Sequence, residues 1–164
     1  MDTSSEQKLV SALIAQHQEL REDVAAILAH ATSLDRSNVD LVYDELSKFK
    51  SDLFQHLKLE NETFYVKYLA KKRSEGEDIE QLNNFIEQMD VIGEVVTQFL
   101  SKYATAESIL NSPTGEFMKR LHEVTDILDV RIETEEGSTY QMFLSTPSSS
   151  DLPRMTEIPL ASER

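Results

Sequence analysis

Cysteine is absent from the 164 residues, and its absence removes several classes of function at once. Without cysteine the chain has no disulfide framework, no thiolate zinc site and no cysteine nucleophile. A small secreted scaffold is therefore not expected, and the chain suits a reducing compartment. At this length a single domain can bury a sufficient core without cross-links.

Positive charge is scarce, and long apolar runs are missing. Lys and Arg number 16 against 30 Asp and Glu, which gives a formal net charge of −14. Such a chain repels nucleic-acid phosphates and anionic lipid headgroups. No run of ~18 apolar residues occurs, and residues 1–6 lack the basic and apolar regions of a secretory signal. We therefore predict a cytoplasmic protein that binds neither nucleic acid nor membrane.

Glycine and proline number only four each, which leaves long stretches free of helix breakers. Apolar residues recur every three or four positions in four segments, at about 6–31, 38–72, 78–104 and 113–143. Ser112 and Pro113 suit the start of the fourth helix, and Gly93 marks either a close helix contact or a weak point in the third. The pattern predicts an all-α, antiparallel up-down-up-down four-helix bundle over 1–143, followed by a flexible Ser- and Pro-containing tail at 144–164.

Polar residues interrupt the apolar stripes at one height of the predicted bundle. Counting from the shared turns at ~1.5 Å per residue brings positions from all four helices into one layer. The layer gathers His17, His56, Glu60, Met89, Arg131 and Glu135. Burying imidazole, carboxylate and guanidinium groups costs several kcal/mol unless they pair or coordinate an ion. The layer is therefore either a ligand site or a closed ion network.

Nitrogen and carboxylate ligands that project inward from bundle helices can hold iron or manganese. His56 and Glu60 lie four residues apart, so both side chains lie on one helix face. Tyr65 follows them and either donates a hydrogen bond into the layer or packs with its hydroxyl in solvent. No glycine-rich phosphate loop, Gly-x-Ser-x-Gly elbow or His-Glu-x-x-His pair occurs, so enzymatic activity is not expected.

Three segments resemble the hemerythrin-like (HHE cation-binding) family. They are Gln-His-Gln-Glu-Leu at 16–20, His-Leu-Lys-Leu-Glu-Asn-Glu-Thr-Phe-Tyr at 56–65, and Leu-Asp-Val-Arg-Ile-Glu-Thr-Glu-Glu at 128–136. The second is the most specific, because the family follows its His-x-x-x-Glu with an acid or amide and then an aromatic pair. The resemblance implies a bundle that binds iron or another divalent metal, or an oxygen species, as a sensor or store. It places His17, His56, Glu60 and either Glu135 or Glu136 at ligand positions.

The chain also departs from the family's ligand pattern. Phe85 and Met89 stand where the family has histidines on the third helix, and Arg131 stands at the histidine position of the fourth. Because arginine keeps its proton and cannot coordinate a cation, a di-iron centre is not expected. One alternative is a single metal ion held by His17, His56, Glu60 and Glu135.

The other alternative is a metal-free layer in which Arg131 bridges Glu60 and Glu135 through bidentate hydrogen bonds. Iron would then be none or substoichiometric, and the bundle would act on a protein partner whose identity, like the oligomeric state, the sequence does not give. The stretch 117–136 resembles the regulator of sigma D family, which binds a sigma factor, although the residues after His56 depart from that family. A strongly acidic surface suits a basic partner.

Overall fold

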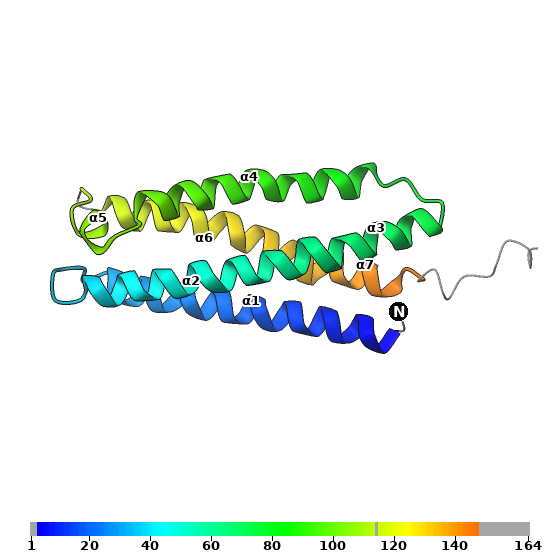
Figure 1. The fold of residues 1–164 in the computed structure, drawn as a ribbon, viewed down its shortest axis with the longest axis horizontal. Helices are drawn as coiled ribbons and strands as arrows, with labels where there is room; N and C mark the ends of the chain where they lie inside the picture. The colour runs from blue at the N-terminus through cyan, green and yellow to red at the C-terminus, as the bar shows by residue number, and fades with distance from the viewer. Residues whose placement is uncertain (1–2, 114, 148–164) are drawn as a thin grey trace, which may run out of the picture.

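Four helical rods run antiparallel in this computed structural model, which describes residues 3–113 and 115–147 (Figure 1). The elements are α1 (Thr3–Ala31), α2 (Val39–Leu59), η1 (Glu60–Phe64), α3 (Tyr65–Ser74), α4 (Glu80–Lys102), α5 (Ala106–Leu110), α6 (Glu116–Thr134), η2 (Glu135–Thr139) and α7 (Tyr140–Ser145). The second rod is continuous from α2 through α3, and the fourth from α6 through α7. Within the described ranges there is no strand, so the predicted all-α bundle is confirmed.

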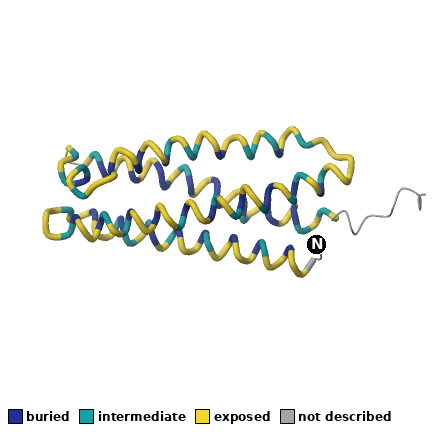
Figure 2. Tube along the Cα trace, viewed as in Figure 1, coloured by how far each residue is buried: buried dark blue, intermediate teal, exposed yellow. Residues whose placement is uncertain are grey.

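Two apolar clusters fill the interior of the bundle, as the buried stripe along each rod indicates (Figure 2). The large cluster includes Phe49, Phe99 and Leu121 and extends to the end of the bundle that carries α5. The small cluster is built around Phe64 and Phe143 at the other end. On the first, second and fourth rods, the predicted polar residues fall in sequence between the segments that supply the two clusters. The apolar packing therefore encloses the polar layer from both ends.

The start of the fourth rod differs from the prediction. Its helix begins at Glu116, after Gly115 with φ of 81°, whereas Pro113 lies in the preceding turn and accepts a hydrogen bond from the Glu116 backbone N–H. The connection also contains α5, which begins with a capping box formed by Thr105 and Ser108. Proline suits a turn as well as a first helical position, so residue type alone did not distinguish the two.

Gly93 is not a point of close helix contact, since a Cβ added there would meet no atom within 4 Å. The prediction of a flexible tail lies largely outside the described residues, although Leu144 and Ser145 belong to α7. No helix in the described part of the chain is both long and apolar enough to cross a membrane.

The second and fourth rods each contain one π-helical turn, η1 and η2. The backbone N–H of Tyr65 donates to the carbonyl of Glu60, and that of Tyr140 donates to the carbonyl of Glu135. Each turn therefore begins at a glutamate of the predicted layer and brings the residue five positions later back over it. Single π turns inside α-helices occur frequently at functional sites.

Candidate metal centre

Four predicted ligands meet inside the bundle. His17 lies on α1, His56 on α2, Glu60 at the start of η1 and Glu135 at the start of η2. One potential ligand atom from each residue lies within 4.8 Å of the others, and all four residues are buried. We call this set the His/Glu centre. Counting residues along antiparallel rods predicted that these four side chains lie at one height, and they do meet there. Their role as metal ligands stays a prediction.

The two imidazoles face one another across the centre. Nε2 of His17 lies 3.1 Å from Nε2 of His56. On the far side of each ring, Nδ1 of His17 donates to Oε2 of Glu136 at 2.8 Å, and Nδ1 of His56 donates to Oε1 of Gln16 at 2.8 Å. These bonds fix the Nδ1–H tautomer, so both Nε2 lone pairs point into the centre. A proton or a metal ion must lie between them, because two bare lone pairs repel.

Glu136 lies outside the centre and supports it. Its carboxylate receives Nη1 and Nη2 of Arg21, each at 3.2 Å, as well as the imidazole of His17. Carboxylates that orient a ligand histidine in this way are typical of metal sites. Of the two glutamates that the sequence left open, Glu135 therefore lies in the His/Glu centre, and Glu136 lies behind His17 and binds its Nδ1.

Two tyrosine hydroxyls complete the polar layer. The Tyr140 hydroxyl donates to Oε2 of Glu60 at 2.9 Å, and the Tyr65 hydroxyl donates to Oε2 of Glu135 at 2.6 Å. The histidines approach the same carboxylates, with His56 Nε2 3.5 Å from Glu60 and His17 Nε2 3.3 Å from Glu135. Each tyrosine thus contacts the glutamate of the opposite rod. Of the two possibilities raised for Tyr65, the buried hydrogen bond is the one observed.

Arg131 lies beside the centre but not in the predicted position. Its Nε donates to Oε2 of Glu135 at 3.2 Å, its Nη2 to the Tyr65 hydroxyl at 3.2 Å, and its Nη1 to the backbone oxygen of Phe85. The guanidinium carbon lies 3.5 Å from the centroid of the Phe85 ring. Among the described residues no ion pair links Arg131 to Glu60, so the predicted bridge forms on one side only. Met89 packs in the large apolar cluster.

Burial and neighbouring charges shift the pKa values of the centre in opposite directions. Burial raises the pKa of Glu60, and the charge of Glu135 raises it further. Burial alone would raise the pKa of Glu135, but hydrogen bonds from His17, Glu60 and Tyr65 and the charge of Arg131 lower it to about 2. Burial lowers the pKa of His17, yet the surrounding glutamates raise it above its usual value. Without a cation, the pKa values of the two carboxyl groups are therefore moved apart, that of Glu60 upward and that of Glu135 downward.

Tyr140 is the residue of the polar layer that helical periodicity missed. The signal was an internal repeat, in which His56, Glu60 and Tyr65 have the same spacing as Arg131, Glu135 and Tyr140. A separation of five residues does not keep two side chains on one face of an α-helix, so an α-helical count discards both tyrosines. The π turns restore them to the face of the glutamates.

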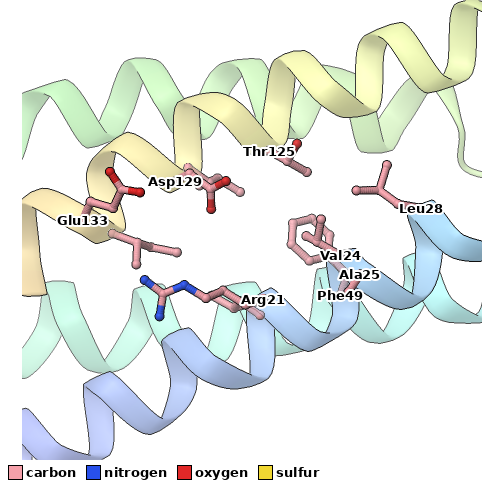
Figure 3. Close-up of a pocket in the computed structure, with 11 residues that line it drawn as sticks. Arg21, Val24, Ala25, Leu28, Phe49, Thr125, Asp129 and Glu133 are labelled. Atoms are coloured by element: carbon pink, nitrogen blue, oxygen red, sulfur yellow. The ribbon is translucent and has the colours of Figure 1, made fainter.

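A separate groove of about 320 Å³ lies between α1 and α6, lined by Leu20, Arg21, Val24, Ala25, Leu28, Phe49, Thr125, Leu128, Asp129, Ile132 and Glu133. Figure 3 shows Arg21 on α1 and Asp129 and Glu133 on α6, with Phe49 between the two helices. None of these described lining residues belongs to the His/Glu centre. Arg21 links the groove to Glu136, the carboxylate behind His17, because its guanidinium donates to both oxygens of that side chain.

A family match agrees with this geometry. The chain matches the family model of the hemerythrin HHE cation binding domain over residues 8–143. It therefore belongs to the hemerythrin HHE cation-binding domain family, and the predicted resemblance is confirmed. Comparisons with curated proteins and with solved structures returned no match. The matched residues include every member of the His/Glu centre and both tyrosines.

Proposed function

We propose that this protein is a non-enzymatic iron-binding bundle that holds one ion in the His/Glu centre and serves as a store or sensor. The observation that carries the proposal is the facing pair of Nε2 atoms on His17 and His56, 3.1 Å apart, with both Nδ1 atoms engaged behind them. Two nitrogen ligands of one ion lie roughly 3.0–3.4 Å apart, since metal–nitrogen bonds are ~2.0–2.1 Å long.

The donor set fits a transition metal. Two imidazole nitrogens with carboxylate oxygens suit iron or manganese, and a two-histidine carboxylate arrangement is typical of non-haem Fe(II) sites. Both histidines also have the outer hydrogen-bond partners that ligand histidines almost always have. Bound iron would supply Lewis acidity and one-electron redox chemistry.

The charges favour one ion over two. Glu60 and Glu135 supply two negative charges, and Arg131 keeps a positive charge 3.2 Å from Oε2 of Glu135. In the internal repeat, Arg131 takes the place that His56 has in the other half. A second cation near Glu135 would lack a nitrogen ligand and would face the guanidinium. The expected stoichiometry is one ion per chain.

Enclosure of the centre supports storage or sensing over catalysis. Each of the four residues is at most 3 % exposed, so a substrate larger than a few atoms could not reach the ligand atoms without opening the bundle. The protein's own residues would bind the ion, orient the imidazoles and exclude bulk water.

Elemental analysis of the purified, untagged protein, expressed with iron, manganese and zinc supplied, tests the proposal. We expect near-stoichiometric iron in the wild type and loss of that iron in His56→Ala. His30→Ala is the matched control, because His30 pairs with Glu45 near the end of α1, away from the centre. Less than about a tenth of an equivalent of any metal in the wild type would overturn the proposal.

A second candidate function is favoured by one observation. Among the described residues, the only buried side-chain oxygen or nitrogen without a hydrogen-bond partner is Oδ2 of Asp23, so the polar atoms of the centre are satisfied without an ion. A metal-free bundle would then be an interaction module, and its net charge of −14 suits a basic protein such as a sigma-factor domain. Metal-free wild-type protein that retains a sigma factor at low salt would support this candidate over the first.

A further inference from the structure

We propose that Tyr140 is a fifth ligand of the His/Glu centre and coordinates a ferric ion through its phenolate oxygen. The inference rests on the proposed function, because it needs iron in the centre. It assigns Tyr140 a role beyond donating a hydrogen bond to Glu60.

The position of the phenol oxygen carries the inference. It lies 2.9 Å from Oε2 of Glu60, 3.3 Å from Nε2 of His17 and 3.4 Å from Oε1 of Glu135. Three of the four candidate ligands are thus within 3.4 Å of one oxygen atom. This spacing matches that between His17 and His56 themselves, 3.1 Å. The hydroxyl therefore occupies a corner of the same cluster of donor atoms and not a second layer behind it.

Tyr65 provides the contrast. Its hydroxyl donates to Oε2 of Glu135 at 2.6 Å and receives Nη2 of Arg131 at 3.2 Å. Oε2 is the oxygen that Arg131 also binds, whereas His17 and Tyr140 approach Oε1. Tyr65 therefore lies on the Arg131 side of Glu135, and Tyr140 lies on the histidine side. The two tyrosines of the internal repeat differ in role because one half holds His56 and the other holds Arg131.

The surrounding structure fixes the Tyr140 ring. The side chain is fully buried, its ring stacks on His17 with centroids 5.7 Å apart, and Phe64 packs edge-on at 5.0 Å. Its backbone N–H is held by the carbonyl of Glu135 through the π turn. The phenol oxygen is therefore positioned before any ion binds, as a ligand site requires.

Three of the ligand groups carry a negative charge once an ion is bound. On binding, the Tyr140 O–H bond breaks, its proton passes to water, and an oxygen–iron bond forms, because a phenol coordinates in its deprotonated form. The two carboxylates and the phenolate then supply three negative charges. Arg131 contributes one positive charge at the edge of the cluster. A hard trivalent cation such as Fe(III) suits this oxygen-rich set better than a softer divalent one.

Visible absorption and resonance Raman spectra of the full chain loaded with ferric nitrilotriacetate test the inference. Phenolate bound to Fe(III) gives a visible charge-transfer band with tyrosine ring modes in the Raman spectrum. We expect both in the wild type and in Tyr65→Phe, and loss of both in Tyr140→Phe. Iron is measured per chain in the same samples, and circular dichroism checks that each variant is folded.

The outcomes separate this inference from the proposed function. Stoichiometric iron without a phenolate band in the wild type overturns the role of Tyr140 and leaves the iron site standing. A band that persists in Tyr140→Phe and disappears in Tyr65→Phe overturns the assignment equally. No iron in the wild type overturns the proposed function itself. Should Tyr140→Phe fail to fold, tyrosine ring modes in both the wild type and Tyr65→Phe still support the assignment.

Discussion

Replacing Asp23 by Asn is expected to make the protein more stable above pH 6 while leaving its stability near pH 4 almost unchanged. Asp23 is buried on α1 and pairs with Nζ of Lys48 at 2.8 Å, while Asp52 holds the same ammonium at 2.7 Å. Its second oxygen, Oδ2, has no hydrogen-bond partner among the described residues. Protonated Asp23 can donate to Asp52, which removes this deficit.

The pKa values give the sign and the size of the effect. Burial and the neighbouring Asp52 raise the pKa of Asp23 from 3.8 to about 6. The protonated form is therefore favoured by folding, and this stabilisation is complete below pH ~4 and lost as the pH rises through ~6. At ~1.36 kcal/mol per pKa unit, the full shift corresponds to about 3 kcal/mol. Because Asp52 titrates together with Asp23 and Lys48 is largely exposed, we expect about half of this.

Asn mimics protonated Asp23, since its amide can donate to Asp52 and its oxygen can accept from Lys48. Urea unfolding followed by circular dichroism at pH 4.5 and 7.5 measures the free energy of unfolding of each variant. The wild type should lose ~1.5 kcal/mol more than Asp23→Asn between the two pH values. Asp44→Asn, at an exposed carboxylate of α2, is the matched control. Equal losses in the wild type and Asp23→Asn would refute the reasoning.

Three further predictions concern the ends of the bundle, its glycines and its centre. Lys71→Met should lower the free energy of unfolding by ~3–5 kcal/mol, because it leaves the buried carboxylate of Glu6, 2.8 Å from Nζ of Lys71, without a partner. The double variant that also carries Glu6→Gln should recover most of this loss in denaturant unfolding. Gly93→Ala should raise the free energy of unfolding by ~0.5–1 kcal/mol, because Gly93 lies in a helix interior with room for a methyl group. Gly115→Ala should lower it by ~1 kcal/mol, because alanine is strained at a φ of 81°. Thermal unfolding of both variants should show opposite changes in stability. Iron affinity should fall as the pH falls, because a raised pKa lets protons compete for the carboxyl group of Glu60; chelator competition at several pH values measures it, and a flat profile would contradict this explanation.

The rods and the meeting of the four side chains of the His/Glu centre could be predicted because both follow from α-helical counting. His17, His56, Glu60 and Glu135 lie on inward faces, and antiparallel rods joined by short turns bring equal heights together. Contacts that depend on side-chain choice could not be predicted in this way. Arg131 was expected to bridge two glutamates, but the ring and backbone oxygen of Phe85 hold its guanidinium on one side. A residue count specifies height and face, and it does not specify which partner a long side chain selects.

The two π turns let the second and fourth rods each hold one residue more than an uninterrupted α-helix would hold there. Each turn absorbs the extra residue, so the helix beyond it faces the interior as though that residue were absent. Deleting Asn61 from η1 or Gly137 from η2 would therefore leave an ordinary α-helix, in which Tyr65 or Tyr140 follows its glutamate by four positions and stays on the interior face. Related chains can thus keep the same arrangement with the tyrosine either four or five residues after the glutamate, which a comparison at fixed spacing would overlook.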